Sequence, residues 1–351
     1  MTLSVDIEKK FGSFELQLSF TAAEGVTGIL GASGCGKSLS LKCIAGLITP
    51  DRGRITLNGR TLFDSARGIN LPPQRRAVGY LFQQYALFPH MTVRENIAAG
   101  LHHLNHREKQ AETLRLLKLF QLEELSELRP AQLSGGQQQR TALARILASR
   151  PEALLLDEPF SALDSYLKQQ VELTLFQQLR DFSGPILLVS HSQQEIRRQC
   201  SHVCVLHKGH AQPMQTTAEL FSAPETLSAC CLSGCENLSP VHLLPGQRAE
   251  SALWGAVLTL PHSCPPDVCY VGIRAGALRL CTAPGVNRIP CVPLTRPFSD
   301  GEATELLLST PGGSAPEQLL RLRCTKELPA LSGPLYVELP PDALQLLRAD
   351  I

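Results

Sequence analysis

Residues 26–38 join an apolar run to a glycine-rich loop, and no other part of the sequence constrains the fold as strongly. The run Val26–Leu30 is followed by GASGCGKS (Gly31–Ser38), which fits the pattern G-x-x-x-x-G-K-[ST]. Glycines allow the backbone to wrap closely around a phosphate, and successive N–H groups can point inward at it. A helix that opens at the end of such a loop adds the positive end of its dipole. The pattern therefore predicts a strand, a phosphate-binding loop and a helix, in that order.

This loop also supplies two side chains with defined chemistry. Lys37 offers a cation to the β- and γ-phosphates of a nucleotide, and Ser38 offers a hydroxyl to Mg²⁺. We therefore expect a nucleotide with β- and γ-phosphates, together with Mg²⁺, and the family resemblance described below implies that this nucleotide is ATP. Taken alone, the pattern is also compatible with an ordinary glycine turn. The residues expected to contact the nucleotide here are Gly31, Ala32, Ser33, Gly34, Cys35, Gly36, Lys37, Ser38 and Leu39.

Other short apolar runs predict strands that are buried on both faces of a parallel sheet. Helical patterns around 114–120 and 143–147 lie between these runs, and this alternation predicts an α/β domain. Nearer the N-terminus, the alternation in Phe14–Phe20 and the Asn-Gly turn within Ile55–Leu62 indicate antiparallel strands. The apolar runs are Val78–Phe82, Ala153–Leu156, Ile186–Val189 and Val203–Leu206.

Two acids follow the apolar run Ala153–Leu156 directly. Asp157 can hold Mg²⁺, either through a water molecule or directly. Glu158 can orient and polarise an attacking water molecule as a general base. An acidic pair after a strand can also be the start of a solvated loop. The phosphate-binding pattern earlier in the chain favours the catalytic interpretation.

Composition narrows the class of protein. The chain has 351 residues, is 43% hydrophobic and carries a net charge of +1, which predicts a globular protein without a basic surplus for nucleic acid. Its first twenty residues lack the apolar core of a signal peptide, and no apolar run approaches the ~20 residues that span a bilayer. We therefore expect a soluble protein, and any membrane role would have to come through a partner. Its 12 cysteines lack paired metal-ligand spacing and are expected to be reduced thiols.

The character of the sequence changes after about Ser222, where proline, cysteine and glycine become more frequent. Short strand-like segments then recur and predict a small β-rich domain. The predicted domains are 1–229, a linker at 230–250, and 251–351. The strand-like segments are Ala252–Leu260, Val268–Arg274, Thr304–Leu308, Leu319–Cys324 and Leu335–Leu339.

One further motif, LSGGQQQR (Leu133–Arg140), lies between the phosphate loop and the acidic pair. With these three motifs in this order, residues 1–230 resemble the ATP-binding subunits of ABC transporters. The resemblance implies a P-loop ATPase domain with an N-terminal antiparallel β subdomain and a helical subdomain. It identifies LSGGQ as the signature motif of that family. Ser134, Gly135, Gly136 and Gln137 then bind the γ-phosphate of an ATP held by a second copy, which implies a homodimer.

The same resemblance implies roles for four further residues. Gln83 matches the Q-loop glutamine, which contacts Mg²⁺ or the attacking water molecule. Asp164, in SALD, matches the D-loop that crosses the dimer interface. His191, in LLVSHS, matches the switch histidine near the γ-phosphate. Phe11 is expected to stack on adenine, whereas Phe14 fits the pattern of a core residue better. Leu39 stands where many relatives have a second Ser or Thr.

The order of domains, one nucleotide-binding domain followed by a small β domain, resembles that of bacterial importer ATPases. These carry a C-terminal domain of the oligonucleotide/oligosaccharide-binding-like (TOBE) type. That likeness implies a peripheral location at the cytoplasmic face of the cell membrane. Two membrane subunits would be contacted through a groove at Tyr85–Asn96, and an extracytoplasmic solute-binding protein would act indirectly. Packing in the core is the alternative role for individual residues there, such as Leu87 and Phe88.

The phrases EPFSALDSYLKQQ, VSHSQQEIRRQC, CLSGCENLS and YVGIRAGALRL are most similar to molybdate-importer ATPases. Molybdate or tungstate is therefore the expected cargo. Sulfate or thiosulfate, iron(III), sugars and polyamines remain as alternatives. A soluble ABC ATPase of DNA repair or translation is a further alternative, but the segment between Ser38 and Ser134 is too short for the usual coiled-coil insertion. The β domain could bind the oxyanion as a regulatory ligand, although no residue can be assigned to such a site.

Overall fold

The structure of the chain is a computed structural model, and it describes residues 1–161, 165–295, 298–299, 303–325 and 334–350. The chain divides into two compact units, Met1–Thr217 and Ala218–Ile351, which are described separately. The predicted fold class is confirmed, because the first unit is an α/β domain with a mixed sheet and the second unit is rich in β-strands.

Five parallel strands form the centre of the first unit, in the order β10-β3-β9-β8-β7. Every residue of β8 and β9 is buried, as the continuous apolar runs predict. Because the strands run in parallel, their carboxyl ends meet at one edge of the sheet. The bounds are β3 (Gly25–Leu30), β7 (Val78–Leu81), β8 (Ala153–Asp157), β9 (Pro185–Ser190) and β10 (His202–His207).

The remaining strands of the first unit form its antiparallel part. β1 and β2 pair along their whole length, from Thr2 opposite Ala23 to Phe11 opposite Phe14. The predicted Asn-Gly turn joins β4 to β5, and both turn residues have the positive φ that this turn requires. The bounds are β1 (Thr2–Phe11), β2 (Phe14–Ala23), β4 (Arg52–Leu57), β5 (Arg60–Asp64), β6 (Ile69–Asn70), β11 (His210–Ala211) and β12 (Gln215–Thr216).

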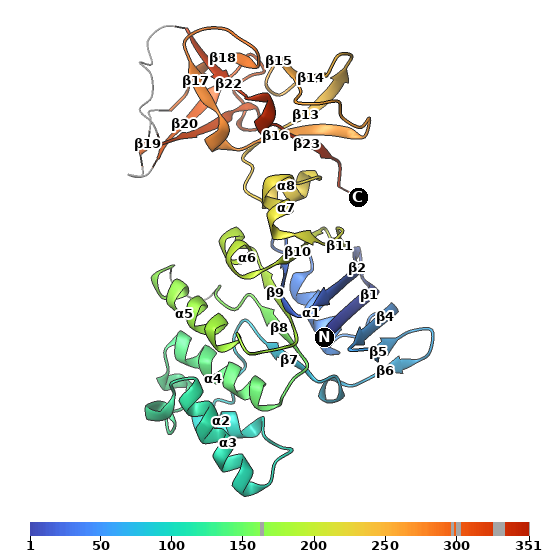
Figure 1. Cartoon of the computed structure of the whole chain (residues 1–351), viewed down its shortest axis with the longest axis vertical. Coiled ribbons are helices and arrows are strands. Elements are labelled where there is room, and N and C mark those ends of the chain that lie inside the picture. The colour runs from blue at the N-terminus through green and yellow to red at the C-terminus, as the bar shows by residue number, and fades with distance from the viewer. Residues whose placement is uncertain (162–164, 296–297, 300–302, 326–333, 351) are drawn as a thin grey trace. The chain divides into compact units, whose positions relative to one another are not determined.

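Helices α2, α3 and α4 gather into a subdomain that lies apart from β1, β2 and β4 (Figure 1). Each of these helices begins with a capping box, in which the side chains of the first and fourth residues bond the opposite backbone N–H. In α3, Leu117 is buried as its spacing predicts, whereas Leu114 faces solvent. The helix bounds are α1 (Lys37–Ala45), α2 (Val93–Ala99), α3 (His106–Leu119), α4 (Gly135–Ala148), α5 (Ser165–Gln178), α6 (Gln193–Gln199), α7 (Thr217–Ser222) and α8 (Leu227–Leu232). Short 3₁₀ helices span η1 (Pro73–Arg75), η2 (Glu123–Leu125), η3 (Pro130–Gln132), η4 (Ala275–Ala277), η5 (Pro316–Gln318) and η6 (Pro341–Ala343).

A fully buried arginine holds the C-terminal end of α1 in place. The Arg76 guanidinium donates to the carbonyl oxygens of Cys43, at 2.9 Å, and Ile44, at 2.8 Å. Orphan carbonyls at the end of a helix need such donors, and a cation there also complements the helix dipole. A Cβ atom at position 46 would lie 2.5 Å from Nε of Arg76, so Gly46 leaves the space that this side chain fills. The helix that follows the phosphate loop is therefore fixed at its far end.

The described part of the second unit forms two sheets around a core that includes the fully buried Trp254. Among its described residues, the strand orders are β15-β14-β13-β16-β23 and β17-β22-β18-β20-β19, and β21 pairs with β20. The bounds are β13 (Asn237–Leu244), β14 (Arg248–Ser251), β15 (Ala256–Thr259), β16 (Val268–Ile273), β17 (Arg279–Cys281), β18 (Arg288–Pro293), β19 (Phe298–Ser299), β20 (Thr304–Ser309), β21 (Leu320–Cys324), β22 (Leu335–Glu338) and β23 (Gln345–Arg348).

The structure differs from the sequence pattern at the start of this unit. Residues 230–250, where the sequence predicts a linker, contain the end of α8, all of β13 and the start of β14. Strand β13 is difficult to predict from the sequence because it contains a proline at position 240, and proline lacks the backbone N–H that a strand donates to its neighbour. Of the strand predicted at 252–260, only 256–259 form one, since 252–255 make a turn. The contacts divide the chain after Thr217, and the functional boundary at residue 229 stays a prediction.

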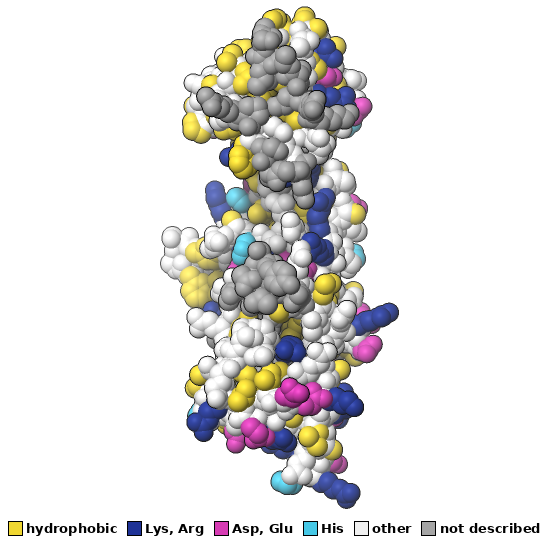
Figure 2. Space-filling view, turned by 90° about the vertical axis from the view of Figure 1, so that its left-hand side faces the viewer, with side chains coloured by type: hydrophobic (Ala, Val, Ile, Leu, Met, Phe, Trp, Pro, Cys, Tyr) yellow, Lys and Arg dark blue, Asp and Glu magenta, His cyan; other side chains and the backbone are white. Residues whose placement is uncertain are grey.

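Within the described part of the chain, no helix is long and apolar enough to cross a membrane. All 12 cysteines lie in that part and are free thiols, and no group of three or more potential ligands there could hold a metal ion. Figure 2 shows lysine and arginine side chains spread over the face that it draws rather than gathered in one place.

Candidate functional site

The glycine-rich loop connects β3 to α1, as the sequence predicts, and two of its glycines are required by geometry. Gly36 has φ +107°, a left-handed conformation that favours glycine, and it caps the N-terminus of α1. At Gly31 a Cβ atom would lie 2.6 Å from the carbonyl oxygen of Leu206, so only glycine lets the loop pass β10. The loop thus reaches the N-terminus of a helix at the carboxyl edge of the parallel sheet.

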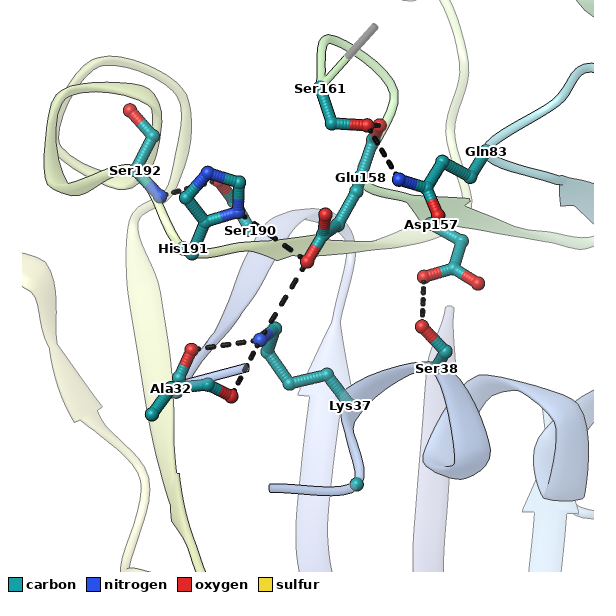
Figure 3. A network of polar contacts seen from close by, with 12 residues as sticks. Ala32, Lys37, Ser38, Gln83, Asp157, Glu158, Ser161, Ser190, His191 and Ser192 are labelled. Atoms are coloured by element: carbon teal, nitrogen blue, oxygen red, sulfur yellow. Dashed lines mark hydrogen bonds and ion pairs between the residues drawn. The ribbon is translucent and has the colours of Figure 1, made fainter. Parts of the chain in front are cut away.

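Lys37 is the first residue of α1, and it is only 5% exposed. Its ammonium group donates to the carbonyl oxygens of Gly31, at 2.8 Å, and Ala32, at 3.0 Å. The same nitrogen lies 3.7 Å from Oε1 of Glu158, as Figure 3 shows. The loop therefore surrounds a buried cation, and an anionic ligand would exchange these oxygen partners for its own.

Asp157, at the end of β8, accepts hydrogen bonds on both of its carboxylate oxygens. Ser38 donates to Oδ1 and Tyr80 donates to Oδ2, each at 2.7 Å. Burial and the bond to Asp157 raise the pKa of Tyr80 above its usual range, so the phenol stays a donor. A carboxylate beside a hydroxyl is the hard oxygen set that Mg²⁺ prefers. The pair Ser38 and Asp157 therefore fits the predicted metal site, and Tyr80 is a partner that the sequence did not reveal.

Glu158 follows Asp157 with φ +44°, so its backbone turns sharply out of the strand. Its N–H donates to the carbonyl oxygen of Val189 at 3.1 Å, which ties it to the end of β9. His191 follows β9, and its Nδ1 lies 3.5 Å from Oε1 of Glu158. This carboxylate oxygen therefore stands between the ammonium of Lys37 and the imidazole of His191 (Figure 3).

The turn that carries His191 is fixed by a buried contact between side chains. Ser190 donates to Oε2 of Glu195 at 2.6 Å and accepts from the N–H of Ser192 at 2.8 Å. Glu195 also pairs with Lys168. We did not predict these positioning residues from the sequence. The spacing Ser192-x-x-Glu195 is a helix-start signal that could have indicated the turn.

Gln83 reaches the same site from the end of β7. Its Nε2 donates to the hydroxyl of Ser161 at 3.0 Å, and that hydroxyl donates to the carbonyl oxygen of Glu158 at 3.0 Å. The predicted catalytic residues Gln83, Glu158 and His191 are thus joined by a short chain of polar contacts (Figure 3). Asp164, the predicted D-loop residue, lies outside the described residues.

A cavity of about 470 Å³ extends from the phosphate loop and Glu158 to the end of β1. Lys37 and Glu158 line it, and so does Phe11, which is 42% exposed. Lys9 places its ammonium 5.3 Å from the centre of the Phe11 ring. Phe14 also lines the cavity and packs against the core, and the stacking of Phe11 on adenine stays a prediction. Other residues of the predicted loop that line this cavity are Ser33, Gly34, Gly36, Ser38 and Leu39.

The predicted signature residues lie at a different place in the same unit. Ser134 caps α4: its hydroxyl accepts from the N–H of Gln137, and its own N–H donates to the Gln137 side chain at 2.8 Å. Ser134, Gly136 and Gln137 line a separate cavity of about 260 Å³, together with Arg140. The residues that line the larger cavity include none of these. A single copy of the described chain therefore does not bring the signature residues and the phosphate loop into one cavity.

The loop after Gln83 is held by an arginine from α4. Tyr85 and Ala86 both have positive φ, at 58° and 46°, which is strained for residues other than glycine. Arg145 donates to the carbonyl oxygens of Tyr85, at 3.2 Å, and Ala86, at 2.9 Å. Its guanidinium also stacks 5.0 Å from the centre of the ring of Phe88, which is 41% exposed.

In this parallel sheet, a strand leads through a glycine-rich loop into a helix. A buried lysine and a hydroxyl–carboxylate pair lie beside that loop. These features define a P-loop nucleotide-binding domain. Comparison with known proteins narrows this class. The family model described as ABC transporter matches residues 16–161. The iron(III) import ATP-binding protein FbpC of Haemophilus influenzae is 38% identical over 239 residues, which cover 67% of this chain and 68% of that protein. The chain belongs to the ABC transporter family of ATP-binding proteins.

Two further relatives are molybdenum import ATP-binding proteins ModC. That of Rhodospirillum rubrum is 39% identical over 223 residues, and that of Paramagnetospirillum magneticum is 42% identical over 222 residues. These matches cover 64% and 63% of this chain, but only 60% and 61% of the two relatives. The chain therefore matches about three fifths of the length of these relatives.

Among solved structures, the ATP-binding cassette MJ0796, a dimer in a post-hydrolysis state bound to ADP and Pi, is similar with a TM-score of 0.52. It is 28% identical in sequence, and the match covers 62% of this chain and 99% of that one. The likeness corresponds to one ATP-binding domain within this longer chain.

Proposed function

We propose that this protein is the ATP-hydrolysing subunit of an ABC importer for an oxyanion, molybdate or tungstate. The observation that carries the proposal is a cavity lined by Lys37, Ser38 and Glu158, with Asp157 bonded to Ser38 and His191 beside Glu158. Phosphate binding, metal binding and activation of water need these three kinds of group within reach of one another.

Each of these groups has a separate task in the proposed mechanism. Lys37 exchanges its backbone and carboxylate partners for the β- and γ-phosphates of ATP. Ser38 and Asp157 would hold Mg²⁺, which neutralises phosphate charge when it is bound. Glu158 orients the attacking water molecule and accepts its proton, while His191 stays beside the same carboxylate and next to the γ-phosphate.

Completion of the site requires a second copy of the chain. Ser134 and the glycines after it form the N-terminus of α4, which offers N–H groups and a positive dipole end to a γ-phosphate. Because these residues lie away from the larger cavity, the phosphate that they bind belongs to ATP held by the partner subunit. Two nucleotides are then enclosed between two subunits, and hydrolysis reopens the dimer. The similarity to a dimeric ATP-binding cassette supports this assembly.

We further propose that the ATP-driven closure is passed to two membrane subunits. The segment Tyr85–Asn96 follows Gln83 directly, and its exposed Phe88 favours a contact surface over a core role for that residue. The protein would work at the cytoplasmic face of the membrane as a peripheral subunit. A solute-binding protein on the other side would contact the membrane subunits rather than this chain.

Molybdate is favoured because several of the most similar relatives are molybdenum import proteins. Iron(III) is the second candidate for the cargo, because the match covers 68% of the FbpC relative, a larger share than for the two ModC relatives. Sulfate and thiosulfate are further oxyanions that the experiment must distinguish.

Uptake of labelled molybdate tests the proposal. Cells that lack this protein are complemented with the wild-type chain or with Glu158→Gln, and sulfate and iron(III) are added as competitors. We expect wild type alone to restore uptake, and excess sulfate to leave it unchanged. Rescue of iron(III) or sulfate uptake instead would discard molybdate and retain the ATPase mechanism. Failure to rescue transport of any of these solutes would overturn the importer function.

A further inference from the structure

Tyr80 is the polar neighbour of the metal-binding pair that has no role in the mechanism above. It lies on β7, and its hydroxyl donates to Oδ2 of Asp157 at 2.7 Å. The other oxygen of that carboxylate accepts from Ser38 at the same distance. Asp157 is only 5% exposed, so few water molecules can compete for its oxygens. The carboxylate is therefore held between two hydroxyl groups that come from different elements.

The register of the sheet places Tyr80 for this contact. β7 and β8 run in parallel, with Tyr80 opposite Leu155, two residues before Asp157. Side chains two residues apart on a strand point to the same face, so Tyr80, Leu155 and Asp157 share one face of the sheet. The long phenol then reaches forward along the strands to the carboxylate. Its ring lies 4.3 Å from the ring of Phe82 and packs against the core, which limits its movement.

The two hydroxyl groups that bind Asp157 differ in what they can do. Ser38 belongs to the phosphate loop, and its hydroxyl is expected to turn toward Mg²⁺ when the nucleotide is bound. Tyr80 is held in the sheet, so its hydroxyl can keep its bond to Oδ2 of Asp157 both with and without bound nucleotide. A carboxylate without that bond could rotate and offer Oδ1 in many directions. Ligands of metal sites are commonly oriented by hydrogen-bonded partners of this kind.

We propose that Tyr80 is a positioning residue for the metal site: by holding Oδ2 of Asp157, it keeps Oδ1 directed toward Ser38 and the metal. This inference rests on the proposed function, since it assigns the pair Ser38 and Asp157 to Mg²⁺. Phenylalanine would fill the same space and make the same ring contacts. The hydroxyl group of Tyr80 is therefore the part of the side chain that positions Asp157. Tyr80→Phe removes this group with the least disturbance of packing.

The test compares wild type with Tyr80→Phe in the full-length protein. Binding of a fluorescent ATP analogue is measured in EDTA and over a range of Mg²⁺ concentrations, and Mn²⁺ bound with ATP is followed by electron paramagnetic resonance. We expect unchanged binding of the analogue in EDTA, and about a 10-fold rise in the metal concentration needed for half-saturation. At saturating Mg²⁺ the kcat of ATP hydrolysis should return to within about threefold of wild type, because the metal ligands themselves are intact. Tyr270→Phe in the second unit is the matched control and should behave as wild type.

Two results would overturn the role of Tyr80. Metal dependence identical to wild type would show that the hydroxyl does not orient the ligand. Equal loss of binding in EDTA and in Mg²⁺ would show that the residue supports the fold of the site rather than the metal. A wild-type protein that binds no ATP analogue under either condition would instead overturn the proposed function, and with it this inference.

Discussion

Replacement of Glu158 by glutamine separates two effects that we propose for this carboxylate, activation of water and competition for Lys37. The substitution keeps the shape of the side chain but removes its charge and its ability to accept a proton. Loss of a general base typically lowers turnover by about 10²–10⁴-fold. ATP binding should respond in the opposite direction, because Oε1 of Glu158 competes for Lys37 from a distance of 3.7 Å.

The size of that second effect follows from the geometry. At an effective dielectric constant of about 20, a unit ion pair at this separation is worth about 4 kcal/mol. His191 shares the same oxygen at 3.5 Å, and the Glu158 side chain is 19% exposed, so water and the imidazole reduce the competition for Lys37. We expect about 1 kcal/mol to remain, which corresponds to about a fivefold gain in ATP affinity.

Three measurements on purified protein check this prediction. Phosphate release gives turnover, a fluorescent ATP analogue gives affinity, and size-exclusion chromatography with ATP detects the closed dimer, which the variant should accumulate. Glu152→Gln, at a surface carboxylate that pairs with Arg60, is the control and should leave all three unchanged. Turnover of Glu158→Gln within about tenfold of wild type would refute the role as general base. A weaker affinity for ATP would refute the competition for Lys37.

Three other substitutions test separate parts of the reasoning. Lys37→Ala should weaken ATP binding by about 10–100-fold, because charge-assisted hydrogen bonds to phosphate are lost, and an unchanged affinity would contradict the phosphate role. Ser134→Arg should bind ATP normally but fail to dimerise, and ATP-dependent dimers seen by chromatography would rule out the contact with the partner's nucleotide. Burial raises the pKa of Cys43 from 9.0 to about 11, so the unfolded chain loses this proton first as the pH rises. Cys43 alone should therefore lower the free energy of unfolding by about 2–3 kcal/mol between pH 9 and 11, in addition to the effect of other buried thiols. Cys43→Ala should make this decline shallower in urea denaturation, and a slope equal to that of wild type would contradict the assignment.

The parallel strands and the phosphate loop could be predicted from the sequence because their signals are local. Five continuous apolar runs and one eight-residue pattern identify them without knowledge of any distant contact. The acidic pair could be predicted for the same reason, since it follows its strand directly. Capping of α4 by Ser134 is also local, because the hydroxyl and its N–H partner are three residues apart.

Contacts between distant residues could not be read in this way. Tyr80 and Asp157 are 77 positions apart, and only the register of β7 against β8 brings the hydroxyl to the carboxylate. The strands of the second unit were still harder to predict. They are short, and two of them contain proline, at position 240 in β13 and at positions 290 and 293 in β18. Those prolines weaken the strand signal, although the residues still pair with their neighbours in the sheets.

The position of Arg145 on α4 links the N-terminus of that helix to the loop after Gln83. Arg145 lies 11 positions after Ser134 on the same helix, and α4 is a continuous rod of 14 residues, about 20 Å long. A ligand that pulls the Ser134 end along the helix axis would also move Arg145, because a hydrogen-bonded helix resists extension. Arg145 donates to two carbonyl oxygens of a strained turn, so such a movement would be passed on to that turn. Helix α4 is thus a rigid connection between the residues that we propose to bind a phosphate and the loop after Gln83.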